Sequence, residues 1–167
     1  MHNELTQIDL DKMKQELDYR RIELRPQLLE EVKVARGFGD LSENFEYKAA
    51  KREKNRNESR IRFLENMIRT ARVYEDKSDA DSIGLYDKIT LWIEEDEEKA
   101  VWQIVTTVRQ DPLNGLISKE SPAGKALLGK KVGDRVHIQV NKEFGYVVVI
   151  RNIEKGIDDG RAQLNEF

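Results

Sequence analysis

Two apolar seams separated by a short, glycine-containing break constrain this chain more than any other feature. In the first seam, apolar side chains recur about every seven residues, at Leu10, Leu17, Leu24, Leu28 and Ala35. The second seam alternates steps of about three and four residues, at Tyr47, Ala50, Lys54, Asn57, Ile61, Leu64, Ile68 and Ala71. Such spacing is typical of coiled-coil helices, and so short a link makes consecutive helices antiparallel. The sequence therefore predicts a helical hairpin over residues 9–74, within an N-terminal domain of residues 1–76.

Three residues interrupt the first helix, which we expect over residues 9–36. Arg21 and Glu31 fall on the apolar seam and should weaken it, because a charged side chain is costly to bury. Pro26 lies inside the helical pattern. Proline lacks a backbone N–H and clashes with the preceding turn, so we expect a bend or a local break there.

The start of the second helix has a capping signal. Asp40 is a good N-cap residue, and Glu43 follows at the position of the second acid of a capping box. We therefore expect the second helix to begin directly after Asp40. Gly37 and Gly39 should end the first helix, because glycine tolerates positive φ.

The second half of the chain changes to β-type patterns and turns. Four apolar runs pair into two expected hairpins: 89–93 with 101–108, and 136–140 with 146–150. Between the hairpins, Ser121 and Gly129 bracket an expected short helix. We therefore predict a small α+β domain over residues 83–155, after a linker at 77–82 and before a loose tail at 156–167.

Composition excludes several classes of protein. Among the 167 residues, 37% are charged, 38% are hydrophobic and 7% are aromatic, which fits an extended solvated helical element with a small core. Cysteine is absent, which excludes disulfides, thiolate zinc sites and zinc-containing coiled-coil regulators. No stretch resembles a membrane span and no targeting signal opens the chain, so we expect a cytoplasmic protein with no membrane partner.

Asp40 and Glu43 have two interpretations at this stage. The simpler one is that both residues only stabilise the start of the second helix. The functional one is that their oxygens help to bind Mg²⁺, which proteins often hold through one or two carboxylates, waters and substrate phosphates. Two acids at the tip of a hairpin cannot enclose a metal ion alone. They could complete a site that another macromolecule supplies in part, and a cap at the same position would not prevent this.

A basic stretch follows the two acids and also has two interpretations. Its cations are Lys48, Lys51, Arg52 and Arg56. The simpler interpretation is a solvated helix face. However, the spacing gathers the four residues on one side of the expected helix, as a contact with a phosphate backbone would require. Phe45 lies beside them, and an exposed Phe45 would indicate a surface for a partner.

Two separate blocks of sequence resemble a known family. The stretch ARGFGDLSENFEYKAAKREKNRNESRIRFLENMIRTARV is similar to the tip and second helix of the bacterial Gre transcript-cleavage factors, most closely the GreA type. The stretch DPLNGLISKESPAGKALLGKKVGDRV resembles the signature region of that family's C-terminal domain. The basic stretch is more like that of the GreB type. Phe45 stands where many relatives have a small residue.

The resemblance implies a division of labour between the two domains. An FKBP-like α+β domain would dock on bacterial RNA polymerase, at the rim of its secondary channel. The hairpin would enter the channel as a coiled coil and reach the exposed 3′ end of backtracked nascent RNA. The chain would act as a monomeric accessory factor that stimulates cleavage by the polymerase and has no nuclease activity of its own.

The resemblance also assigns roles to individual residues. Asp40 and Glu43 match the tip acids, which would share a Mg²⁺ ion with the polymerase. The other matched tip positions are Arg36, Ser42, Asn44 and Tyr47. Lys51 and Arg52 match the basic patch that contacts RNA, and Lys48 and Arg56 extend it.

Two alternatives remain at the level of sequence. One is a regulator that binds the same channel and modulates the polymerase without cleavage, although both acids are present. The other is a structural coiled-coil adaptor, for which the two acids would serve only as a cap.

Overall fold

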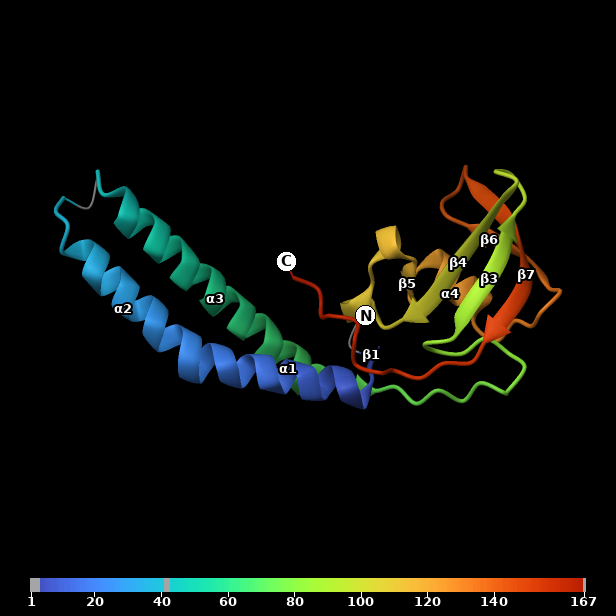
Figure 1. Cartoon of the computed structure of the whole chain (residues 1–167), viewed down its shortest axis with the longest axis horizontal. Coiled ribbons are helices and arrows are strands. Elements are labelled where there is room, and N and C mark those ends of the chain that lie inside the picture. Colours follow the sequence, from blue (N-terminus) through green and yellow to red (C-terminus); the bar gives the residue numbers. More distant parts are fainter. Residues whose placement is uncertain (1–3, 41–42, 167) are drawn as a thin grey trace. The chain divides into compact units, whose positions relative to one another are not determined.

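The computed structural model describes residues 4–40 and 43–166, which form two compact units (Figure 1). One unit spans Asp9–Arg72, and the other combines the N-terminal residues up to Ile8 with the chain from Val73 onward. Within the residues described, no helix is both long and apolar enough to cross a membrane.

The first unit is an antiparallel helical hairpin, as predicted. Its elements are α1 (Gln7–Tyr19), the π-helical segment η1 (Arg20–Leu24), α2 (Arg25–Arg36) and α3 (Phe45–Thr70). In Figure 1, α3 returns alongside the first three elements. The interface contains the predicted apolar residues of both seams, with Leu64 fully buried and Ile61 2% exposed. These side chains leave water on folding, which is the main favourable contribution to the packing of the two helices.

The segment η1 explains how the first helix accommodates proline. Pro26 lies in the first turn of α2, directly after the π-helical turn. A proline nitrogen has no hydrogen to donate to the carbonyl group one turn earlier, and its ring crowds that carbonyl group. A wider π turn relieves the clash, and in Figure 1 the helix bends between α1 and α2, as we expected.

The π turn also changes which residues face α3. A π turn inserts one residue relative to the α-helical pattern. The buried position after the turn is therefore Val32, whereas Glu31, which we placed on the seam, is exposed. Arg21, the other residue that we placed there, is also exposed and forms an ion pair with Glu65.

Polar residues in the interface are paired across the two helices. Arg20 Nη1 donates to Asn57 Oδ1 at 2.9 Å, and Asn57 Nδ2 donates to the Arg20 carbonyl oxygen at 3.3 Å. Arg60 is 6% exposed and donates two hydrogen bonds to Glu16, at 2.8 and 3.0 Å. These bonds explain why the second seam tolerates Asn57 at a buried position, since a buried polar group is costly only when it lacks a partner.

The second unit is built on a five-stranded sheet with the strand order β5-β4-β3-β7-β6. Its strands are β3 (Lys88–Ile93), β4 (Glu98–Val105), β5 (Leu116–Ser118), β6 (Arg135–Gln139) and β7 (Gly145–Glu154). Strands β4 and β5 are parallel, and the other neighbours are antiparallel. The predicted hairpins are β3–β4 and β6–β7, whereas β5 was not predicted. A separate two-stranded sheet joins β1 (Glu4–Leu5) to β2 (Arg72–Val73).

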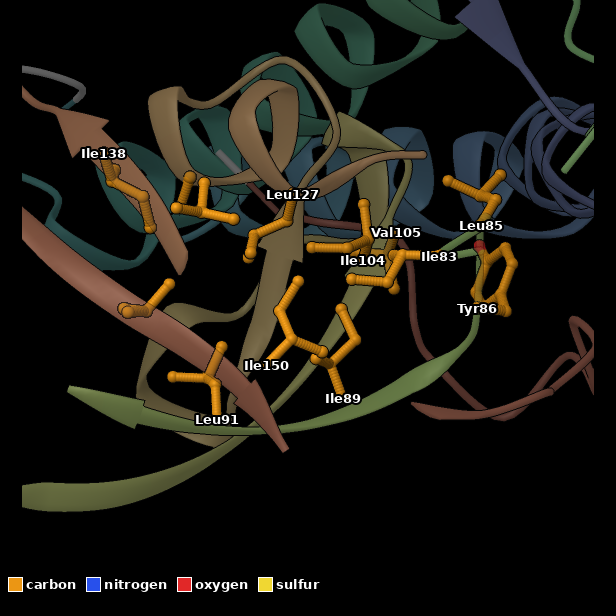
Figure 2. Close-up of a cluster of buried hydrophobic side chains, with 13 residues drawn as sticks. Ile83, Leu85, Tyr86, Ile89, Leu91, Ile104, Val105, Leu127, Ile138 and Ile150 are labelled. Carbon is orange, nitrogen blue, oxygen red and sulfur yellow. The ribbon is translucent and has the colours of Figure 1, made fainter. Parts of the chain in front are cut away.

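Three short helical elements complete this unit: η2 (Thr107–Arg109), η3 (Pro112–Asn114) and α4 (Pro122–Leu127). Ser121 caps α4 as predicted, because its side-chain oxygen accepts a hydrogen bond from the Gly124 N–H at 3.0 Å. Figure 2 shows Leu127 of α4 above Ile89, Ile104 and Ile150 of the sheet. The α+β organisation of this domain is confirmed.

The tail after Glu154 makes contacts that the sequence did not indicate. Asp158 accepts a hydrogen bond at 2.7 Å from Arg109, whose side chain is fully buried. The Asn165 N–H donates to the Val108 carbonyl oxygen at 2.7 Å, and the Gly156 N–H donates to Asp87 at 2.9 Å. These bonds attach to this domain a segment that we expected to be loose.

Candidate functional site at the hairpin loop

The loop that joins α2 to α3 contains the two acids of interest. Helix α2 ends in two tight turns, in which Gly37 N–H donates to Val34 and Phe38 N–H donates to Ala35. Gly39 then has a φ of +123°, a conformation that side-chain-bearing residues rarely adopt. Asp40 follows this glycine directly.

Asn44 closes the loop through both ends of its side-chain amide. Its oxygen accepts a hydrogen bond from the Tyr47 N–H at 3.0 Å and so caps α3. Its nitrogen donates to the Ala35 carbonyl oxygen, at the end of α2, at 2.6 Å. The side chain is only 6% exposed, so both bonds are shielded from water. A single residue thus connects the end of one helix to the start of the next.

The capping box that we predicted for Asp40 and Glu43 is wrong. Helix α3 begins at Phe45, and Asn44 is its N-cap. Asp40 contributes a backbone bond instead, because its carbonyl oxygen accepts from the Glu43 N–H at 3.4 Å. An amide side chain was required here, since only an amide can cap α3 with its oxygen and donate to Ala35 with its nitrogen.

Asp40 and Glu43 are both exposed residues of this loop. Since neither caps α3, a purely helix-capping role no longer explains them. Carboxylate oxygens are suitable ligands for Mg²⁺. The described residues contain no group of three or more potential ligands, so the two acids would need oxygens from a partner to complete a site. Ser42, which we predicted to support the tip, lies outside the described residues.

Arg36 and Tyr47 meet beside the loop, from the ends of the two helices. The Arg36 guanidinium lies 5.5 Å from the centre of the Tyr47 ring, and Lys51 Nζ lies 5.9 Å from the same point. A hydrogen bond with Arg36, together with nearby cations, lowers the pKa of the Tyr47 hydroxyl. The structure thus brings together three predicted tip residues, Arg36, Asn44 and Tyr47, in one arrangement under the loop. Their roles in function stay predictions.

The predicted basic patch is an exposed feature of α3. Lys48, Lys51, Arg52 and Arg56 are all exposed. Lys48, Arg52 and Arg56 are four residues apart in turn and share one face, whereas Lys51 lies toward Tyr47. Within the described residues, an ion pair involves only Arg56 among these cations, with Glu53 at 3.3 Å. The patch therefore keeps most of its charge for solvent or for a partner.

Two phenylalanines flank the acids in the chain. Phe38 is 70% exposed and Phe45 is 79% exposed. Lys48 Nζ lies 5.8 Å from the centre of the Phe45 ring, within the range of a cation–π contact. The exposure of Phe45 meets the condition that we set for a partner surface.

The fold and the loop together define a two-domain class of protein: a helical hairpin with an acidic loop, followed by a small α+β domain. Comparison with family models specifies the class further. The N-terminal transcription elongation factor model matches residues 3–73, and the GreA/GreB C-terminal model matches residues 77–155. The chain belongs to the GreA/GreB family of transcription elongation factors.

Individual relatives agree with this assignment. Transcription elongation factor GreA of Geobacillus kaustophilus is 46% identical over 81% of this chain and 86% of its own length. GreA of Staphylococcus carnosus is 41% identical over 90% of this chain and 94% of its own. The crystal structure of GreA factor homolog 1 from Thermus thermophilus is 27% identical and covers 93% of this chain and 100% of its own. Its TM-score of 0.42 is too low to add weight.

Proposed function

We propose that this protein binds bacterial RNA polymerase through the secondary channel and stimulates the polymerase's own cleavage of backtracked nascent RNA. In this proposal the C-terminal domain docks on the polymerase, and the hairpin brings its loop to the polymerase active centre. The protein is then an accessory factor that acts as a monomer in the cytoplasm. It has no nuclease activity when the polymerase is absent.

The observation that carries the proposal is the exposed position of Asp40 and Glu43 between two helix ends that Asn44 connects. Asn44 supplies the cap of α3 and the bond to α2. The two acids are therefore not needed to start the helix, and both face outward from the protein core as exposed residues.

We propose that Asp40 and Glu43 hold a Mg²⁺ ion jointly with the polymerase. The two carboxylates fit this ion, which prefers oxygen ligands and commonly uses one or two acids from a protein. When bound, Mg²⁺ would stabilise charge on the scissile phosphate and favour deprotonation of a water molecule. The role of the chain is to position the two carboxylates. Arg36 and Tyr47, which contact each other at the ends of the two helices, support the loop.

The exposed cations of α3 support contact with RNA. Lys48, Arg52 and Arg56 share one face of the helix, directly after the loop. The two carboxylates would repel an RNA phosphate backbone that lies near them. Contacts between the phosphates and these cations would offset that repulsion. We propose that this face and the adjacent Lys51 hold the displaced RNA.

A backtracked elongation complex tests the proposal directly. The complex is assembled with Mg²⁺ and 3′-end-labelled RNA, and the release of a short 3′ fragment is followed with the full-length chain. We expect the wild type to accelerate release. With the double variant Asp40→Asn/Glu43→Gln, the stimulated rate of release should be lower by roughly 100-fold or more, since metal stabilisation is worth several kcal/mol.

A matched control separates loss of the acids from loss of charge in general. Glu30 is an exposed acid of α2, and Glu30→Gln should leave stimulation unchanged. Polymerase binding by the double variant should also be retained. If the wild type binds the polymerase but never shortens the RNA, the protein is a modulator without cleavage activity and the proposal fails.

A further inference from the structure

Phe45 is the feature of the loop region that the proposed function does not yet use. It is the first residue of α3 and directly follows the capping residue Asn44. At 79% exposed, its ring contributes little apolar burial to the hairpin. Its aromatic contact is with Lys48, at 5.8 Å from the ring centre. A large aromatic ring in this position is costly to solvate and is not explained by folding.

The ring continues the line of cations along α3. Phe45, Lys48, Arg52 and Arg56 follow one another at steps of three, four and four residues, so they form a single stripe on the helix. All four are exposed. At about 1.5 Å per residue, the stripe is roughly 16 Å long. A stripe of this length can follow a chain of phosphates rather than hold one isolated anion.

This combination matches the chemistry of a single-stranded nucleic acid. Proteins bind unpaired strands with cations along the backbone and with aromatic rings on which bases stack. Neither part alone would identify the partner, because an exposed ring also fits a protein surface and a basic face also fits an acidic one. The ring stands at the end of the stripe that is nearest to Asp40 and Glu43 in the chain.

We propose that Phe45 is a stacking platform for an unpaired base of the displaced RNA, while Lys48 and Arg52 contact the neighbouring phosphates. This inference rests on the proposed function and deepens it by naming what the loop region recognises. Stacking holds the RNA beside the two acids and so orients the bond that is cleaved. Because purines have the larger π surface, stimulation is greater when the stacked base is a purine.

The test combines a protein variant with an RNA variant in a backtracked elongation complex. One RNA has a normal displaced 3′ segment, and the other has abasic nucleotides in that segment. Phe45→Ala should reduce stimulated cleavage of the normal RNA by roughly 5- to 10-fold, a modest value for loss of one stacked base. The same variant should have no effect on the abasic RNA, because there is no base to stack.

Two further variants distinguish stacking from simple apolar contact. Phe45→Trp keeps an aromatic face and should retain the activity, whereas Phe45→Leu is apolar without one and should behave like Phe45→Ala. Phe38→Ala is the matched control, since Phe38 is similarly exposed but lies outside the stripe, and it should leave cleavage unchanged. Thermal unfolding should be the same for all four variants.

The possible outcomes separate this inference from the proposed function. If the wild type stimulates cleavage and Phe45→Ala is equally active, or if Phe45→Ala weakens cleavage of both RNAs to the same extent, stacking is wrong and cleavage stands. Wild-type activity in Phe45→Leu would mean that the ring meets an apolar protein surface, which also overturns stacking. If the wild type stimulates neither RNA, the proposed function itself fails.

Discussion

The middle of the hairpin and its loop contain the same kinds of charged residue but use them differently. In the middle, Arg60 of α3 donates to Glu16, which also accepts from Arg20 one turn further along its own helix, and Arg25 donates to Glu58 of α3. Two of these three pairs join an acid of one arm to a base of the other. Toward the loop, acids and bases are exposed and segregated along the chain. Charge serves the protein's own interface in the first region and is exposed to solvent in the second.

Exposure, not composition, separates the two roles of charge. A partly buried ion pair is costly to break, because the remaining charge loses its partner in a poorly solvated position. An exposed charge contributes little to stability. Substitutions in the middle should therefore lower the stability of the hairpin more than the cleavage activity. Substitutions in the loop should do the reverse. Four predictions on the stability of the hairpin test this, from the largest effect to the smallest.

Leu64→Ala in the apolar seam should destabilise the hairpin most. Leu64 is fully buried, and truncation of a buried leucine costs about 3 kcal/mol through lost burial and the cavity that remains. Urea unfolding followed at the helical band of the far-UV circular dichroism spectrum would measure the change. A loss below about 1 kcal/mol would mean that the two helices are not held together by this seam.

Asn44→Ala should cost about 2 kcal/mol, because it removes both a helix cap and a buried hydrogen bond to Ala35. Asn44→Asp separates the two parts, since aspartate can still cap α3 but cannot donate to Ala35 when ionised. Both variants should also weaken cleavage, because the ends of α2 and α3 that flank Asp40 and Glu43 lose a direct connection. Full cleavage activity in Asn44→Ala would show that the loop geometry is irrelevant to the acids.

Glu16→Gln should cost roughly 1–2 kcal/mol at neutral pH, less than a fully buried pair, because the Glu16 side chain is partly exposed. Burial alone would raise the pKa of Glu16, but hydrogen bonds and charge from Arg60 and Arg20 outweigh it and lower the pKa. A carboxyl group whose pKa is lower in the folded state stabilises that state above its unfolded pKa, about 4.3 for glutamate. That contribution is lost as the pH falls through the folded-state pKa.

The wild type and Glu16→Gln should therefore become more alike in acid. The difference in their free energies of unfolding, measured in urea at a series of pH values, should be constant near neutrality and shrink below the ordinary glutamate range. A difference that does not change with pH would mean that the carboxylate charge of Glu16 is not what stabilises the pair. Lys14→Gln, at an exposed position of the same helix, is a control that should show no such trend.

Asp40→Asn/Glu43→Gln should have the smallest effect on stability, within about 0.5 kcal/mol, because both side chains are exposed. The same double variant should show the largest effect on cleavage. A stability loss above about 2 kcal/mol would mean that the two acids stabilise the hairpin, as the paired charges of its middle do.

Much of the fold was predictable because its patterns are local. Spacing of apolar residues identified the hairpin, runs of apolar residues identified four strands of the sheet, and Ser121 identified the start of α4. The predicted seam of the second helix even included the polar residue Asn57, which is buried. In each case the signal comes from residues within a few turns of one another, where periodicity reflects which face meets the core.

The remaining features depend on partners that are distant in sequence or on a choice between neighbouring caps. Strand β5 is only three residues long and is recognisable mainly by its parallel pairing with β4. The tail gave no sign that Asp158 would meet a buried arginine. For the start of α3, both Asp40 and Asn44 are good caps, and the decisive bond from Asn44 to Ala35 crosses the loop. The location of Asp40 and Glu43 between the two helices was thus predictable, whereas the bonds of Asn44 were not, and the roles of the site residues stay predictions.

The single inserted residue at η1 has a practical consequence for hybrid proteins. On the N-terminal side of this turn, Leu17 faces α3 in one register, and on the C-terminal side Val32 faces it in a register displaced by one position. A chimera that exchanges α1 or α2 with a relative keeps complementary helix surfaces only when both parent proteins have the same inserted residue at this turn. The junction should be placed so that Arg20–Leu24 and Pro26 come from one parent.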